Sequence, residues 1–278
     1  MFSSVVPISD VVDRLDGGSV VFLDCRFSLA DTESGRREYL EAHVHGAHYA
    51  HLDEDLSGRV VPGKTGRHPM VDTANFVGFL NRCGVSSGTQ VFTYDDSGGP
   101  FAARAWWLLR YFGHDAVAVV DGGWGALRNS GLPIDQAIPH SNNGDFQPDE
   151  QHAMLAVSAD VENVVRSGGT TLIDARAADR FLGLNEPIDP VAGHIPGAKS
   201  CPFKSNLRAD GFFLEPQILQ SRYASILDDD DVISYCGSGV TAAHNVLAMV
   251  YAGLPMPSLY VGSWSEWITD SDRPVESG

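Results

Sequence analysis

The sequence predicts an α/β protein made of two tandem copies of one domain, each a parallel sheet with helices on both faces. Two observations predict this fold class. First, four segments of the first half recur in the same order in the second half, about 140 to 151 residues further along. Second, short apolar β-branched runs alternate with helical patterns in both halves, which is typical of parallel sheets covered by helices.

The recurring segments are the evidence for duplication. They pair VVFLDCRFS (20–28) with TTLIDARAA (170–178), VHGAHYAHL (44–52) with IPGAKSCPF (195–203), VFTYDDSGGPFAARAWWLL (91–109) with VISYCGSGVTAAHNVLAMV (232–250), and VVDGGWGAL (119–127) with YVGSWSEWI (260–268). A single match can arise by chance, whereas four matches in the same order indicate a tandem repeat.

Both halves predict the same series of elements. A helix opens each half, with Ser9 or Ser158 as its N-cap. Three strands follow, and a long helix lies between the second strand and the third. The predicted strands are 20–24, 90–94 and 116–121 in the first half, and 171–174, 231–235 and 258–262 in the second.

The domain boundaries follow from the composition of the segment that joins the halves. Residues 137–152, AIPHSNNGDFQPDEQH, are polar and rich in Pro, Asn and Gly, and therefore predict a linker. The first domain is then 1–136 and the second 153–278. The DDDD run at 228–231 is interpreted as a solvated turn rather than a metal site.

Composition excludes several classes of function. A formal net charge of −17 disfavours nucleic-acid binding, and an anionic substrate would need a local positive pocket. No apolar run reaches the roughly 18 residues of a membrane span, and the N-terminus has no signal-peptide pattern. Four cysteines without a CxxC pair predict reduced thiols, no metal site and a cytoplasmic location.

One cysteine occupies a position suited to chemistry. Cys236 directly follows the strand 231–235, and CGSGVT (236–241) leads into a helix. Ligands of parallel sheets gather at the carboxyl ends of strands. Gly237 and Gly239 allow successive N–H groups to converge on the sulfur, and the helix N-terminus adds positive potential. These surroundings favour a nucleophilic thiolate and stabilise an anion attached to it.

The other half has lost this nucleophile. Asp95 stands at the position of Cys236, so the first domain is predicted to be non-catalytic and to supply a wall of the site. The remaining cysteines, Cys25, Cys83 and Cys201, are interpreted as inert, because free cysteines are often buried packing residues.

These motifs resemble the tandem rhodanese sulfurtransferases over nearly the whole chain. The residues that carry the resemblance are the aspartate at 95, DARAADRF (174–181), GHIPGA (193–198), CGSGVT (236–241) and GSWSEW (262–267). The resemblance implies two rhodanese-like domains and transfer of sulfane sulfur through a persulfide of Cys236. It implies a small anionic sulfur donor, a thiol, thioredoxin or cyanide as acceptor, and no metal or organic cofactor.

The loop is similar to that of 3-mercaptopyruvate sulfurtransferases. Ser238 stands where thiosulfate sulfurtransferases of the animal type carry a basic residue. By position in the motifs, the catalytic serine, histidine and aspartate of the mercaptopyruvate enzymes map to Ser238, His68 and Asp53. The loop positions Gly237, Gly239, Val240 and Thr241 are expected to bind the substrate.

Two arginines bind the substrate carboxylate in that subfamily. The first maps to Arg180, but Ile188 stands at the position of the second. An isoleucine side chain cannot form the two hydrogen bonds that an arginine donates to a carboxylate. Thiosulfate therefore stays open as the donor. Arg26 and Arg176 occur in both halves and are interpreted as partners in structural ion pairs.

Two other functions are alternatives to sulfur transfer. Phosphatases and arsenate reductases also hold an oxyanion over a cysteine, but they need an arginine six residues after it, where Ala242 stands here. A non-enzymatic sulfur-relay module is the remaining alternative, and the complete loop around Cys236 argues against it.

Overall fold

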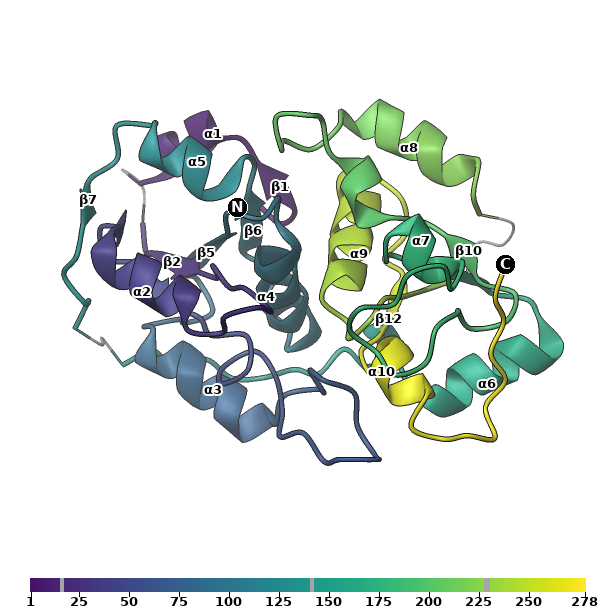
Figure 1. Cartoon of the computed structure of the whole chain (residues 1–278). Helices are drawn as coiled ribbons and strands as arrows, with labels where there is room; N and C mark the ends of the chain where they lie inside the picture. The colour runs from purple at the N-terminus through teal and green to yellow at the C-terminus, as the bar shows by residue number, and fades with distance from the viewer. Residues whose placement is uncertain (16–17, 141–142, 228–230) are drawn as a thin grey trace. The chain divides into compact units, whose positions relative to one another are not determined.

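The computed structural model describes residues 1–15, 18–140, 143–227 and 231–278, which form two compact units (Figure 1). The first unit comprises Met1–Gly58, Val71–Gln151 and Ala209–Phe213, and the second comprises Arg59–Met70, His152–Arg208 and Leu214–Gly278. Each half of the sequence therefore lends a short segment to the other unit. Residues 141–142 of the predicted linker, and all of the DDDD run except Asp231, lie outside the described ranges.

The first unit is built on a five-stranded sheet in the order β1-β6-β5-β2-β4, in which every pair is parallel. The first unit also contains a separate two-stranded antiparallel sheet, β3-β7. The strands are β1 (Val5–Val6), β2 (Val20–Asp24), β3 (His43–Val44), β4 (His48–Tyr49), β5 (Gln90–Tyr94), β6 (Val117–Val120) and β7 (Ile134–Asp135), and the helices are α1 (Ile8–Arg14), α2 (Ser34–Glu41), α3 (Thr73–Arg82), α4 (Pro100–Tyr111) and α5 (Gly123–Arg128).

The second unit repeats this order strand for strand, as β8-β12-β11-β9-β10, again with parallel pairs only. Its strands are β8 (Leu155–Ala156), β9 (Thr171–Asp174), β10 (Lys199–Ser200), β11 (Val232–Tyr235) and β12 (Ser258–Tyr260), and its helices are α6 (Ser158–Ser167), α7 (Ala178–Phe181), α8 (Pro216–Ala224), α9 (Thr241–Tyr251) and α10 (Ser263–Trp267), with 3-10 turns η1 (His152–Met154) and η2 (Phe203–Asn206). The predicted α/β fold and its duplication are confirmed.

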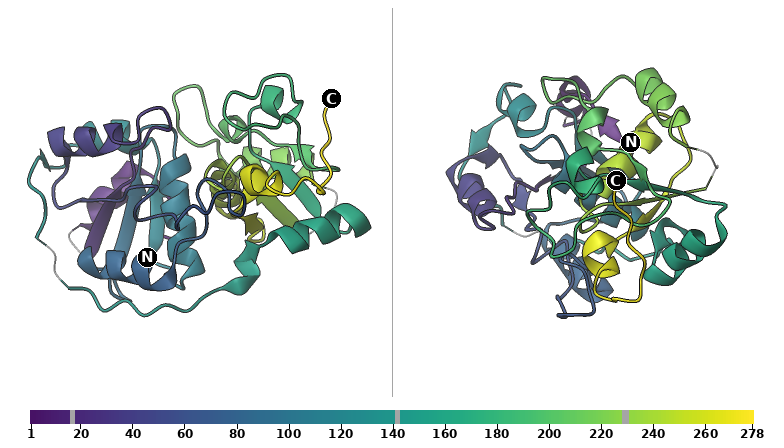
Figure 2. Two further views of the ribbon diagram at one scale, coloured as in Figure 1. Left: turned by 60° about the horizontal axis from the view of Figure 1, so that its bottom comes forward. Right: turned by 45° about the vertical axis from the view of Figure 1, so that its right-hand side comes forward.

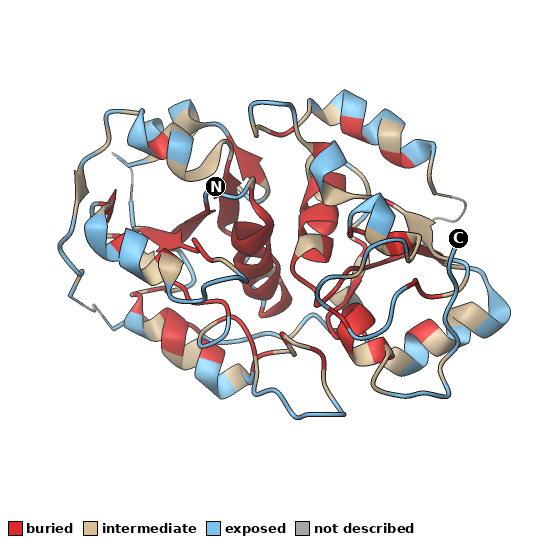
Figure 3. Ribbon diagram, in the orientation of Figure 1, coloured by how far each residue is buried: buried red, intermediate tan, exposed pale blue. Residues whose placement is uncertain are grey.

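Helices cover both faces of each sheet (Figure 2). In the second unit, Ile233 and Tyr235 of β11 pack on one face with Val161 of α6 and Trp264 of α10. Ser234, which points to the opposite face, donates from Oγ to the carbonyl of Ala242 in α9. Most strand residues in both sheets are buried (Figure 3), so apolar burial holds the strand ends in fixed positions.

The predicted helix starts were wrong by one or two residues. The N-cap of α1 is Pro7 and that of α6 is Val157. Asp160 performs the capping at α6, since its carboxylate accepts the N–H of Val157 at 2.9 Å. The Ser158 hydroxyl instead donates to the Glu266 carboxylate at 2.6 Å. The short strands β1 and β8 ahead of these helices were not predicted, because two residues carry no periodicity.

The repeat extends to buried ion pairs at the ends of β2 and β9. Arg26 pairs with Asp24 at 2.5 Å, and Arg176 pairs with Asp174 at 2.7 Å, as expected of structural salt bridges. Each guanidinium also lies over a tryptophan ring, Arg26 over Trp124 at 4.5 Å and Arg176 over Trp264 at 4.8 Å. Trp124 therefore corresponds to Trp264, which shifts the alignment of the fourth repeated segment by one residue.

Candidate active site

Cys236 is the first residue after β11, and the loop it opens ends where α9 begins at Thr241. Its side chain is almost completely buried. The N–H of Gly239 donates to the Cys236 sulfur at 3.2 Å, and Gly239 has a φ of +77°, a backbone conformation that favours glycine. The glycine at this position therefore aims an N–H group at the sulfur.

The turn before α10 holds the cysteine loop in place. The Ser263 hydroxyl accepts the N–H of Cys236 at 3.1 Å, and the N–H of Trp264 donates to the Cys236 carbonyl at 3.0 Å. Ser265 donates its N–H to the Gly237 carbonyl at 2.9 Å. Among the described non-glycine residues, Ser263 alone has a positive φ, of 55°, in the left-handed region. The GSWSEW segment thus holds the backbone of Cys236 and Gly237 in position.

Two of the predicted catalytic side chains meet in the second unit. His68 Nδ1 lies 2.7 Å from Ser238 Oγ, and both residues are buried. A hydroxyl beside an imidazole can pass a proton to or from a reacting group. Asp53 belongs to the first unit, where it is exposed and its N–H donates to His51 Nδ1 at 3.1 Å. The pairing of Asp53 with His68 stays a prediction.

The other predicted loop residues lie at the start of α9 and beside two arginines. Val240 is buried and is the N-cap of α9, and Thr241 is the first residue of that helix. The guanidinium groups of Arg67 and Arg180 both lie close to Gly237. A Cβ atom at this glycine would be 2.7 Å from Arg67 Nη2 and 3.7 Å from both terminal nitrogens of Arg180.

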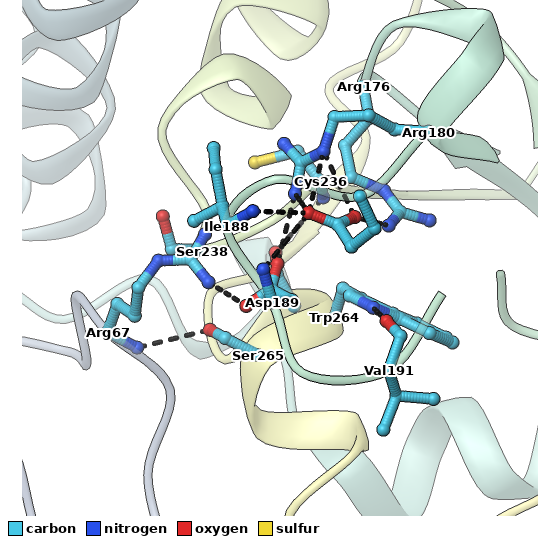
Figure 4. Close-up of polar contacts among 12 residues, drawn as sticks. Arg67, Arg176, Arg180, Ile188, Asp189, Val191, Cys236, Ser238, Trp264 and Ser265 are labelled. Atoms are coloured by element: carbon cyan, nitrogen blue, oxygen red, sulfur yellow. Dashed lines mark hydrogen bonds and ion pairs between the residues drawn. The ribbon is translucent and has the colours of Figure 1, made fainter. Parts of the chain in front are cut away.

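Arg180 reaches the loop but is engaged by two carboxylates (Figure 4). Its guanidinium donates to Glu186 at 2.7 to 3.1 Å and to Asp189 at 3.0 Å. Ile188, which replaces the expected second arginine, is 45% exposed. Its N–H donates to the Glu186 carboxylate at 3.1 Å, so the backbone at this position orders the acidic partner of Arg180.

Arg67 is a further residue of the site that the sequence did not predict. It lies next to His68 in GRHPM, and its guanidinium forms an ion pair with Asp189. Its backbone N–H donates to Ser265 Oγ at 3.1 Å, which ties the segment 59–70 to the start of α10. Its position beside the assigned histidine was the available signal, but contact with a loop 170 residues away follows only from the fold.

In the first unit, the equivalent loop surrounds the side chain of Asp95, which replaces the cysteine. The Asp95 carboxylate is fully buried and accepts N–H bonds from Ser97, Gly99, Phe101 and Ala102 at 2.8 to 3.0 Å. Burial nevertheless raises the pKa of Asp95 to about 6. The loop that follows β5 therefore points several N–H donors at one site, and the carboxyl group of Asp95 occupies that site.

The remaining cysteines lie in surroundings that disfavour thiolate chemistry. Burial raises the pKa of the Cys25 and Cys83 thiols well above the ordinary value, and it raises the pKa of Cys201 to about 11. Such thiols are protonated near neutral pH and are poor nucleophiles. All four cysteines are free.

Comparison with known proteins agrees with this geometry. The profile of the rhodanese-like domain matches residues 8–130 and 158–270. The chain is 47% identical, over 95% of both chains, to a probable 3-mercaptopyruvate sulfurtransferase of Pseudomonas aeruginosa. It is 32% identical to the thiosulfate sulfurtransferase of Bos taurus, over 90% of this chain and 86% of that one.

Solved structures give the same result. The 3-mercaptopyruvate sulfurtransferase of Leishmania major superposes with a TM-score of 0.81 at 31% identity, covering 95% of this chain and 74% of that one. The corresponding Escherichia coli structure gives 0.82 at 27% identity, covering 95% and 100%. Within the described ranges, no helix is both long and apolar enough to cross a membrane. The chain belongs to the rhodanese family and is a sulfurtransferase with two rhodanese-like domains.

Proposed function

We propose that the protein transfers sulfur from 3-mercaptopyruvate to a thiol or cyanide acceptor, and that Cys236 carries it in between as the sulfane sulfur of a persulfide. The observation that carries the proposal is the hydrogen bond of the Gly239 N–H to the Cys236 sulfur, in a loop closed by the N-terminus of α9. N–H donors aimed at a sulfur favour its anionic form, both as a thiolate and as a persulfide.

The first half-reaction makes the persulfide. The Cys236 thiolate attacks the sulfur of mercaptopyruvate, the new S–S bond forms, and the C–S bond breaks. The bonding electrons leave with the carbon fragment as the enolate of pyruvate, which takes up a proton to give pyruvate. The pair of Ser238 and His68, 2.7 Å apart, is suited to delivering that proton, with Asp53 assigned to orient the histidine.

The second half-reaction empties the site. An acceptor thiolate, from a small thiol or thioredoxin, or a cyanide ion attacks the outer sulfur of the persulfide. The S–S bond then breaks and returns the Cys236 thiolate.

The donor is proposed to be bound by Arg180 and by the loop residues Gly237, Gly239, Val240 and Thr241. The four free cysteines suit a reducing compartment, and we place the protein in the cytoplasm on that basis.

Thiosulfate is the alternative donor, and one observation favours it. Although CGSGVT contains no cationic side chain, the guanidinium groups of Arg67 and Arg180 both approach Gly237. Two cations can bind a dianion such as thiosulfate, so the site is better suited to thiosulfate than the uncharged loop sequence suggests. The relatives that match this chain also carry both names.

Paired kinetics with the two donors test the proposal. We expect kcat/KM for 3-mercaptopyruvate to exceed that for thiosulfate by at least about tenfold, roughly 1.4 kcal/mol in transition-state binding. A preference of the same size for thiosulfate would overturn the donor assignment and keep the persulfide route. Absence of transfer from either donor would reject both.

A further inference from the structure

Two guanidinium groups converge on the residue that follows the nucleophile. Arg67 Nη2 is 2.7 Å and the terminal nitrogens of Arg180 are 3.7 Å from the point where a Cβ of Gly237 would lie. Any side chain at 237 would therefore fill the space beside the arginine forks. The two arginines come from distant parts of the sequence, yet both belong to the second unit.

A single carboxylate joins them. Arg67 pairs with one oxygen of Asp189, and Arg180 donates to the other at 3.0 Å (Figure 4). The Asp189 side chain is buried, with 3% of its surface exposed, whereas the Arg67 side chain is 30% exposed. Asp189 thus holds the position between two cations that an anionic ligand of this loop would also prefer.

Asp189 differs from its neighbour Glu186 in how firmly it is held. Glu186 accepts bonds from Arg176 and Arg180 and from the N–H groups of Ile188 and Asp189. Burial acts to raise the pKa of Glu186, but these hydrogen bonds hold it below its ordinary value. For Asp189, burial outweighs the arginines and raises the pKa. Within the described ranges, the Asp189 carboxylate accepts hydrogen bonds only from Arg67 and Arg180.

Hydrogen bonds hold the backbone around Arg67 and Asp189 in place. One donor of Arg67 nevertheless lacks an acceptor among the described residues. Trp264 donates from Nε1 to the carbonyl of Val191 at 2.9 Å, which anchors the segment that carries Asp189. Ser265 holds the backbone of Arg67. The buried Nε of Arg67 has no hydrogen-bond partner within the described part of the chain. A buried donor without a partner is costly, so an acceptor brought by a ligand would be stabilised there.

We propose that Arg67 is a second binding residue for the anionic group of the sulfur donor, and that this group displaces the Asp189 carboxylate from between Arg67 and Arg180. The proposal rests on the sulfurtransferase function proposed above. It gives the site two forks for one anion although Ile188 occupies the position of the expected second arginine. Asp189 acts as the resident counter-ion that keeps the two cations paired when no donor is bound.

The first test compares two arginines of the segment 59–70. Arg67→Gln removes the proposed contact, and Arg59→Gln makes the same charge change at an exposed position. We expect Arg67→Gln to raise KM for 3-mercaptopyruvate and thiosulfate by about tenfold or more with a smaller change in kcat, since it removes one cationic partner of the bound anion. Arg59→Gln should stay within about twofold of the wild type. Arg67→Lys, which keeps the charge and loses the fork, should fall between them.

The second test reads binding without transfer. Thiosulfate is titrated by calorimetry into protein carrying Cys236→Ser, with and without Asp189→Asn. Asp189→Asn removes the competing carboxylate charge, so we expect thiosulfate to bind several-fold more tightly. Weaker binding in that variant would overturn the counter-ion role, and equal KM values for Arg67→Gln and Arg59→Gln would overturn the role of Arg67. Lack of turnover by the wild type itself would instead reject the function on which the proposal rests.

Discussion

Ser238 Oγ lies 2.7 Å from His68 Nδ1, although 170 residues separate the two side chains in the sequence. The segment 59–70 is part of the second compact unit, which explains how a histidine of the first half reaches the loop of the second. This relationship separates the two donors, because pyruvate release requires a proton whereas sulfite release does not.

Ser238→Ala should therefore affect the donors unequally. We expect kcat with 3-mercaptopyruvate to fall by roughly 10²- to 10⁴-fold, the usual worth of positioned acid–base catalysis. With thiosulfate, kcat should change much less. His68→Asn is the matched variant on the other side of the hydrogen bond and should show the same asymmetry. An equal loss with both donors would mean that the pair only supports the loop.

Ile188→Arg restores the arginine that the mercaptopyruvate enzymes carry at this position. Ile188 is half exposed and adjoins Asp189, so a longer side chain can be accommodated at this position. We expect kcat/KM for 3-mercaptopyruvate to rise by roughly tenfold, about 1.4 kcal/mol. Ile188→Gln controls for added polarity without charge. No gain, or a loss, would count against a missing arginine as the limit on this donor.

The buried pairs of Arg26 and Arg176 should govern stability rather than donor choice. Removing one partner leaves a buried carboxylate without its cation, at a cost of about 3–5 kcal/mol. We expect Arg26→Met and Arg176→Met each to lower the melting temperature clearly. Arg176→Met should leave the ratio of kcat/KM values for the two donors unchanged. A changed ratio at wild-type stability would assign Arg176 to the donor site instead.

Asp95 should make stability depend on pH. Its pKa is raised by burial to about 6, from an ordinary value of 3.8, so the folded chain holds this proton more tightly than the unfolded chain. The stability gained by protonation is present below about pH 4 and is lost as the pH rises through about 6. The free energy of unfolding of the wild type, relative to Asp95→Asn, should fall by ~2–3 kcal/mol between pH 4 and 7.

The control for that titration is Asp96→Asn, which changes the exposed neighbouring carboxylate. Chemical denaturation of the three proteins at several pH values gives the comparison. If the wild type and Asp95→Asn keep a constant difference across this range, the carboxyl group is ionised throughout, and its four N–H donors outweigh burial.

Much of the fold was predictable because duplication shows every pattern twice. The strands 20–24, 90–94 and 171–174 have the predicted bounds, and the other three differ by one or two residues at one or both ends. Cys236 was evident from its place between strand and helix. Arg67 and Asp189 were not, because their meeting depends on the packing of a segment from the first half, and neither residue carries a local pattern.

The central claim, a persulfide on Cys236, is tested most directly by mass spectrometry. The protein is incubated with 3-mercaptopyruvate and no acceptor, and the intact mass and the modified peptide are then measured. We expect the wild type to gain the mass of one sulfur atom on the peptide that contains Cys236, and to lose it on addition of cyanide. Cys236→Ser should gain none and transfer none, whereas Cys201→Ser should behave as the wild type. Sulfur transfer by Cys236→Ser, or a wild type that carries the sulfur on another cysteine, would contradict the account.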